Sequence, residues 1–118
     1  MTVFVPGKLR NFDNGAHGHW SKKAIYRKRW REAVMLCIRQ EKCTMRPNDP
    51  KTITLTAHVW NRFDAHDGLR SALKPCIDGL VDAGVIQGDG PRVAHDFRYA
   101  QCINRHTQGV YLEIDAAP

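Results

Sequence analysis

The sequence predicts an α+β fold: a single domain with a small mixed sheet and two packing helices. The first indication is length, because 118 residues suit one domain of ordinary size. The second is periodicity, since two stretches carry apolar residues at helical spacing and others alternate at strand spacing. These stretches follow one another in the order β-α-β-α-β-β, without an internal repeat or a linker. We therefore treat residues 1–118 as one domain.

The N-terminal third is expected to hold a strand, a loop and a helix. Thr2–Val5 is a short apolar strand, and residues 7–20 are rich in glycine, asparagine and histidine, which predicts a long loop. Ser21 is the expected N-cap of a helix that runs to about Glu41. One face of this helix is apolar and carries Tyr26, Trp30, Ala33, Val34, Cys37 and Ile38.

The central third is expected to hold a strand and a second helix. Lys51–Trp60 alternates strictly between apolar and polar residues, as a half-buried strand does. The second helix covers roughly Leu69–Ala83, and Gly84 ends it. Pro75 falls inside this stretch, so it either occupies the first turn of the main helix or kinks a longer one.

Two further strands are predicted at the C-terminal end. Arg92–Ile103 and Val110–Asp115 both carry apolar residues at even intervals. The polar segment Asn104–Gly109 separates them and is expected to join them as a hairpin.

Several classes of protein are disfavoured by composition. No apolar run approaches the ~18 residues of a membrane span, and the N-terminus lacks the basic-then-apolar order of a signal peptide. We therefore expect a cytoplasmic protein. The four cysteines form no C-x-x-C and no zinc-finger spacing. His17 and His19 resemble half of a metal site, but they lie in the expected loop, and structural zinc is not favoured.

Charge is distributed unevenly along the chain. Residues 8–31 contain eight lysines or arginines and a single acid, Asp13, whereas residues 63–89 contain five aspartates against Arg70 and Lys74. A basic arm that neutralises phosphates, beside carboxylates that hold cations, is what a metal-using nuclease needs. The alternative is two solvated helix faces, which is the commoner explanation of charge runs.

Three aspartates are the candidate metal ligands. Asp64 and Asp67 follow the central strand, and Asp89 lies in the glycine-rich turn after the second helix. We expect both ends of this helical unit to return to the same edge of the sheet. Three carboxylates there suit Mg²⁺, with Mn²⁺ as a substitute. From the spacing alone, capping of turns by these aspartates is the favoured alternative.

The segment Arg62–Val93, RFDAHDGLRSALKPCIDGLVDAGVIQGDGPRV, resembles the signature region of the RusA family of Holliday-junction resolvases. In that family an Asp-x-Asp-Asn-like cluster follows a strand, a lysine comes within two helical turns, and an Asp-Asp turn closes the pattern. Here Lys74–Leu80 matches the middle piece, and Ala83–Asp89 matches the closing piece. The layout of the whole chain fits the family, although about thirty residues carry the specificity.

This sequence departs from the family pattern at two points. The first cluster reads Asp64-Ala65-His66-Asp67, so Asp67 stands either for the second acid or for the asparagine after it. In the second case His66 takes the place of the second acid and can approach the metal. The closing turn has Gly88-Asp89 where two acids are usual, which leaves Asp89 as the one ligand there.

The resemblance implies a role for each candidate residue. Asp64, Asp67 and Asp89 hold Mg²⁺, which polarises the scissile phosphate and activates a water molecule. Lys74 lies on the same helix face as Asp67, and the family places an essential lysine here to stabilise developing charge. On sequence alone, an i,i+4 ion pair with Asp78 is the favoured alternative for Lys74. DNA contacts are assigned to the basic helix, at Lys22, Lys23, Arg27 and Arg29.

Three other side chains have less specific interpretations. His95 is interpreted as a strand histidine rather than a site residue. Trp20 and Trp30 are expected to contact the core or a second chain rather than to stack on bases.

The leading hypothesis is a Mg²⁺-dependent endonuclease that cleaves branched DNA and resolves four-way junctions. A symmetric homodimer is expected, because a four-way junction has near two-fold symmetry and needs two matched cuts. The apolar residues Trp60, Phe63 and Tyr111 are candidates for the contact between chains. Two alternatives stay open: a non-catalytic nucleic-acid-binding module on the same fold, and a metal-dependent RNA nuclease.

Overall fold

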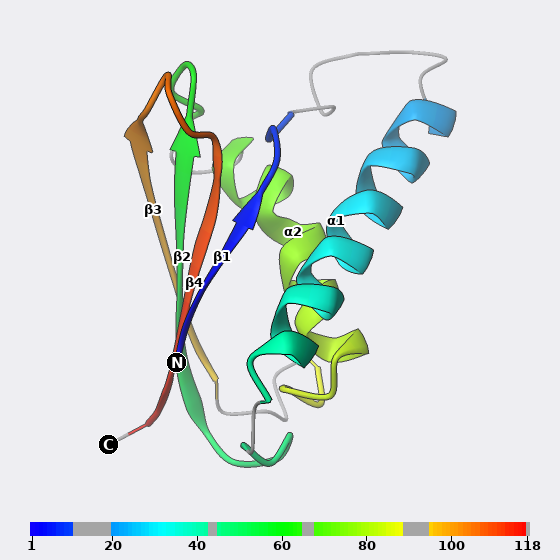
Figure 1. The fold of residues 1–118 in the computed structure, drawn as a ribbon, viewed down its shortest axis with the longest axis vertical. Helices are drawn as coiled ribbons and strands as arrows, with labels where there is room; N and C mark the ends of the chain where they lie inside the picture. The colour runs from blue at the N-terminus through cyan, green and yellow to red at the C-terminus, as the bar shows by residue number, and fades with distance from the viewer. Residues whose placement is uncertain (11–19, 43–44, 65–67, 89–94, 118) are drawn as a thin grey trace.

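The computed structural model describes residues 1–10, 20–42, 45–64, 68–88 and 95–117. One four-stranded sheet forms a layer, and two helices cover one of its faces (Figure 1). The predicted α+β architecture and the element order are confirmed. The elements are β1 (Thr2–Pro6), α1 (Trp20–Gln40), β2 (Lys51–Val59), α2 (Gly68–Asp82), β3 (Asp96–Ile103) and β4 (Gly109–Ala116).

The strand order is β1-β4-β2-β3, and this order corrects the predicted hairpin. β3 pairs with β2 in parallel, whereas β4 pairs antiparallel with both β2 and β1. The helix α2 carries the chain from the end of β2 back to the start of β3, as a crossover between parallel strands requires. β3 therefore occupies one side of β2, and β4 takes the other side. The connection from β3 to β4 is bonded to β2, because the backbone N–H of Asn104 donates a hydrogen bond to Val59 O over 2.9 Å.

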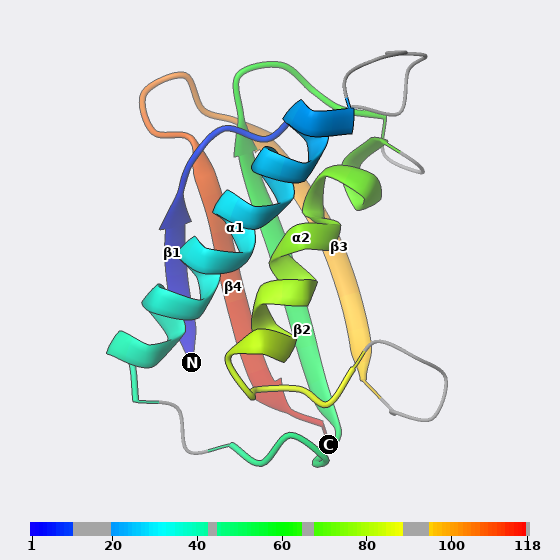
Figure 2. The ribbon, with the colours of Figure 1, turned by 90° about the vertical axis from the view of Figure 1, so that its right-hand side faces the viewer.

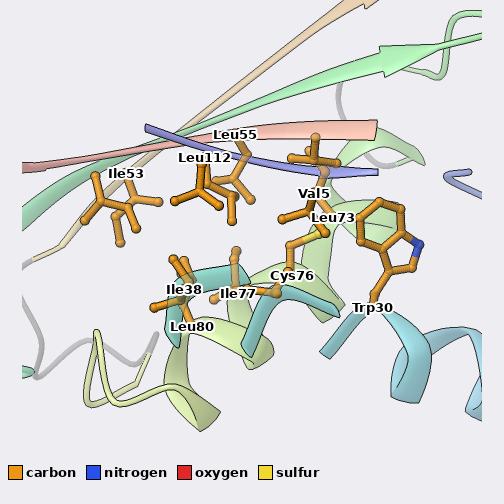
Figure 3. Close-up of a cluster of buried hydrophobic side chains, with 14 of the residues drawn as sticks. Val5, Trp30, Ile38, Ile53, Leu55, Leu73, Cys76, Ile77, Leu80 and Leu112 are labelled. Atoms are coloured by element: carbon orange, nitrogen blue, oxygen red, sulfur yellow. The ribbon is translucent and has the colours of Figure 1, made fainter. Parts of the chain in front are cut away.

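The core lies between the sheet and the two helices (Figure 3). The predicted alternation of β2 is confirmed, because every second residue from Lys51 to Val59 is buried. The helix α2 is embedded in this core, whereas α1 contributes only a narrow buried stripe: Trp30, Val34 and Ile38. Trp30 is thus a core residue, as expected, and Cys76 is fully buried, which raises the pKa of its thiol.

A close crossing joins the two helices. A Cβ placed on Gly79 of α2 would lie 2.8 Å from Cβ of Val34 on α1, so glycine allows this approach. Beside the crossing, Arg31 makes two hydrogen bonds to the carboxylate of Asp82, at 2.8 and 2.9 Å. The guanidinium lowers the pKa of Asp82 below its usual value. Pro75 lies in the middle of α2, so its placement in a first turn is wrong.

Some predicted element bounds shift by a few residues. Ser21 is the second residue of α1 rather than its N-cap, a displacement within the usual uncertainty of helix ends. β3 begins at Asp96 and not at Arg92, and residues 92–94 lie outside the described residues. None of the helices in the described part of the chain is long and apolar enough to cross a membrane.

In the part of the chain that the structure describes, both helices lie on one side of the sheet and no helix covers its second face (Figure 1). At its centre the ring of Tyr111 lies 4.7 Å from that of Phe4 and 4.8 Å from that of His58, measured between centroids. Tyr111 remains 38% exposed. This aromatic cluster is an apolar patch on an open surface.

Candidate nucleic-acid interface and metal site

One end of the molecule holds half of the chain's 18 lysines and arginines. The C-terminal end of β2, the N-terminal ends of α1 and α2, the end of β1 and the β3–β4 connection all meet there, at the top of Figures 1 and 2. We call this region the basic end and define it as residues 6–10, 21–27, 60–64, 68–74 and 104–109. Its lysines and arginines are Lys8, Arg10, Lys22, Lys23, Arg27, Arg62, Arg70, Lys74 and Arg105. Its one acid is Asp64, and because the whole chain carries +6, the rest of the chain is slightly acidic.

The segment after β1 is held against α1 by Trp30. Gly7 has a positive φ of 152°, and a Cβ there would lie 3.0 Å from the indole ring of Trp30. The indole Nε1 donates a hydrogen bond to Lys8 O at 3.2 Å. The backbone that carries Lys8 is therefore fixed by a buried side chain of the core.

Tyr26, one helical turn before Trp30, also holds the segment after β1 against α1. The backbone N–H of Arg10 donates to the Tyr26 hydroxyl at 3.2 Å, and the hydroxyl donates to Ala72 O of α2 at 2.9 Å. Burial raises the pKa of Tyr26, so the hydroxyl stays protonated and able to donate. One side chain thus joins three segments of the basic end.

Two hollows flank α1, and the four lysines and arginines predicted to contact DNA line them. Lys22 and Arg29 line a hollow of about 430 Å³ between α1 and the end of β1. Lys23 and Arg27 line a smaller one, of about 110 Å³, between α1 and α2. Arg10 lines both, which connects the two hollows into one basic surface.

Lys74 of α2 lies in the smaller hollow together with Lys23, Arg27 and Ser71. Its Nζ is also 3.7 Å from Oδ1 of Asp78, one helical turn further on. The structure thus shows the ion pair with Asp78, and the catalytic role of Lys74 stays a prediction. The ion pair is partly exposed and is worth only a few tenths of a kcal/mol, roughly, so it does not prevent Lys74 from contacting an anion.

Asp64 is positioned by the chain on both sides of it. The side-chain amide of Gln101 on β3 accepts from Phe63 N–H and donates to Phe63 O, both at 2.9 Å. The carbonyl of Asp64 accepts from Leu69 N–H at 2.8 Å, next to the first residue of α2. Asp64 is exposed and lies at the positive end of the helix dipole. Asp64 thus belongs to the basic end, at the entrance to α2.

The remaining predicted ligands cannot be placed. Asp67, Asp89 and the alternative ligand His66 lie outside the described residues. Within the described residues, no three His, Cys, Asp or Glu side chains gather as a metal site would require. The three-aspartate site stays a prediction.

The two ends of α2 lie at opposite ends of the sheet, contrary to our expectation. Asp64 precedes the helix, whereas Gly88 follows its C-terminal end, near the start of β3 (Figure 2). A helix of 15 residues is about 22 Å long. The reason is the crossover: α2 must run antiparallel to β2 and β3 to connect their opposite ends.

His95 lies at the far end from Asp64, just before β3. Its Nδ1 accepts a hydrogen bond from Lys51 N–H at 3.2 Å, and its ring contacts Phe97 edge to face. Burial, together with the nearby charge of Lys51, lowers the pKa of His95. His95 therefore precedes the strand rather than belonging to it, and it lies at the opposite end of the sheet from Asp64.

Sequence reasoning missed part of the basic end. Arg10 was counted in the basic window but was not named as a contact, and Tyr26 was assigned only to the helix core. Arg62, Arg70 and Arg105 come from three separate segments, and only the strand order brings them together. Phe63, expected to be exposed, is partly buried against the core. A search for lysines and arginines near element ends would have found the arginines.

Comparisons with known proteins add no relative. A scan against protein-family models finds no match, and a search of curated proteins finds none either. The likeness to the RusA resolvases therefore rests on the residues of Arg62–Val93.

Proposed function

We propose that this protein is a Mg²⁺-dependent endonuclease that cleaves branched DNA, with four-way junctions as its substrate. The observation that carries the proposal is the basic end, where nine lysines and arginines from five chain segments lie at the same end of the molecule as Asp64. Phosphate contacts supply most of the affinity for DNA. An exposed acid at the same end weakens the binding of phosphates, which favours a chemical role for it.

Each residue has a task in phosphodiester hydrolysis. Lys22, Lys23, Arg27 and Arg29 bind phosphates along both sides of α1, and Arg10 links the two hollows. Asp64, with Asp67 and Asp89, holds Mg²⁺, which supplies Lewis-acid catalysis and an activated water when bound. Lys74 stabilises charge that develops on the phosphate. Such an enzyme acts on DNA in the cytoplasm.

The length of α2 separates the candidate metal ligands before the helix from the segment after it. Gly88, the last described residue before Asp89, follows the C-terminal end of α2, whereas Asp64 precedes the other end of this 15-residue helix. We therefore infer that a metal ion shared by Asp64 and Asp89 takes one aspartate from each of two chains. A symmetric homodimer forms two such sites, which matches the two cuts that junction resolution requires.

An apolar surface for chain–chain contact is available on the open face of the sheet. Phe4, His58 and Tyr111 form a cluster there, and neither of the two described helices covers it. Light scattering is expected to report twice the chain mass of 13.4 kDa.

A non-catalytic nucleic-acid-binding module is the second candidate. It is favoured by the closing turn of the sequence, where Gly88-Asp89 stands in place of the two acids that are usual in the RusA family. The basic end alone is sufficient for this function. A metal-dependent RNA nuclease is the third candidate, since the same surface suits RNA phosphates.

One assay separates the three candidates. A synthetic four-way junction, a linear duplex of the same sequence and a structured RNA are each incubated with and without Mg²⁺. We expect paired cuts in the junction only, and only with Mg²⁺. Binding without any cleavage supports the module, and cleavage of the RNA alone supports the RNA nuclease; either result contradicts the proposal.

A further inference from the structure

Trp60 is a large aromatic residue on the surface of the basic end. It follows β2 directly, and 51% of its surface is exposed. Its position is fixed from one side, because Arg105 Cζ lies 5.3 Å from the ring centroid and Arg105 Nε donates to Trp60 O at 3.4 Å. The indole is therefore held in place while half of it stays open to solvent. Exposed tryptophans that are ordered in this way are typical of stacking sites.

A hollow of about 340 Å³ lies beside this ring. Its apolar lining includes Leu9 and Phe63, and the backbone of Phe63 is clamped by Gln101. Asn61 and Gln108 add side-chain amides, which can both donate and accept hydrogen bonds. A volume above about 300 Å³ is in the range of small-molecule sites. Aromatic, apolar and amide groups together suit a flat heterocycle with polar edges.

Two positively charged residues line the hollow and suit a heterocycle that carries phosphate. They are Lys8 and Arg10, and Arg10 also lines the two hollows beside α1. A group bound against Trp60 is thus continuous with the surface assigned to DNA phosphates. This combination suits a base that is attached to a phosphate backbone.

We propose that this hollow takes an unpaired nucleobase of the DNA substrate, which stacks on Trp60 while its phosphates contact Lys8 and Arg10. The inference rests on the proposed function and specifies which part of the substrate is recognised. Bases inside a duplex are stacked and paired, whereas bases at a branch point are more easily unstacked. Trp60 precedes Asp64 by only four residues, so a base held there places its strand near the candidate metal ligand. The hollow would select branched over linear DNA.

The test measures binding without metal, so that cleavage plays no part. An oligothymidylate with one 2-aminopurine and a linear duplex are titrated in EDTA against the wild type, Trp60→Ala and Trp60→Phe. Because Trp60→Ala removes the ring on which the base stacks, its affinity for the single strand should fall by about 5- to 150-fold. Trp60→Phe should keep most of the affinity, and duplex binding should be unchanged in both variants. The 2-aminopurine fluorescence should be quenched by the wild type but not by Trp60→Ala.

Three outcomes overturn the inference. Unchanged single-strand affinity and quenching in Trp60→Ala would show that no base stacks there, and a shift from dimer to monomer in that variant would assign Trp60 to the chain–chain contact. Equal losses for oligothymidylate and duplex would instead indicate a general phosphate surface. Melting curves that match the wild type verify that the variants are folded. Stacking without any junction cleavage would contradict the proposed function alone, whereas cleavage without stacking would contradict this inference alone.

Discussion

The two ends of α2 differ in almost every property that matters for binding DNA. At the N-terminal end lie Asp64, nine lysines and arginines, and three hollows. At the C-terminal end, Lys51 is buried, and its Nζ donates to the backbone carbonyls of Arg46 and Asp49, while His95 accepts from its backbone. The first end concentrates lysines and arginines, whereas the buried lysine of the second end is bonded to the backbone. This difference supports the proposal that the first end binds a polyanion.

The distance between the two ends of α2 limits which candidate acids can bind the same metal ion. A crossover helix separates the residues before it from those after it by its own length, here about 22 Å. Asp64 and Gly88, the last described residue before Asp89, belong to opposite ends in this sense. This separation supports the proposal that a metal ion is shared between two chains, which would tie the metal site to the oligomeric state.

Charge reversal at each end of α1 gives the largest expected contrast in binding. The double variant Lys23→Glu and Arg27→Glu should weaken junction binding and reduce the log–log salt slope by about 0.9 for each lost phosphate contact. The matched double variant Arg39→Glu and Lys42→Glu changes the same charge at the far end and should leave the slope unaltered. Filter binding or fluorescence anisotropy across a salt series checks both. Equal slopes in the two variants would indicate that α1 is a solvated face.

Gly79→Ala tests the packing near the far end. The added Cβ would meet Val34 at 2.8 Å, so the two helices must move apart. Overpacking of this kind costs about 1–3 kcal/mol of unfolding free energy. Urea denaturation should show that loss, while the salt slope of binding in the folded variant stays as in the wild type. A variant of unchanged stability would show that the helix crossing is looser than described.

His95 predicts a smaller effect, which depends on pH. Its pKa is lowered in the folded state, so the unfolded chain binds more protons below the usual value of 6.5. Stability is thus fully present above pH 6.5 and declines as the pH falls through the lowered pKa. His95→Asn keeps an acceptor but removes the titration, so its melting temperature should fall less between pH 7 and pH 5. A parallel decline in both proteins would exclude His95 as the source.

The contrast between the two ends also explains what the sequence predicts well. The periodicity of apolar residues predicts the two helices and β2, because an element that buries one face carries its apolar residues at regular spacing. The alternation from Ile53 to Val59 is a direct example. The position of β4 does not follow, because Val110–Asp115 has the same pattern whether it pairs with β3 or with β2. The hairpin predicted at residues 104–109 is therefore wrong, and the sequence does not reveal which segments meet at each end of the sheet. Only the parallel pairing of β2 and β3 reveals that Asp64 and Gly88 lie at opposite ends.

The most direct test of this account uses two inactive variants together. Asp64→Asn and Asp89→Asn should each reduce Mg²⁺-dependent junction nicking by about 100-fold or more, because metal catalysis is worth several kcal/mol. Junction affinity should stay near that of the wild type, and Asp49→Asn at the far end serves as the matched control with full activity. The two inactive variants are then co-expressed with different tags and purified as a heterodimer.

If each metal ion is bound by Asp64 of one chain and Asp89 of the other, the heterodimer holds one intact site and one doubly substituted site. We predict that it recovers about half of the wild-type nicking rate, since a C₂ dimer has two equivalent sites. A heterodimer as inactive as its parents would contradict a site shared between chains. Wild-type activity in either single variant would contradict the metal site itself.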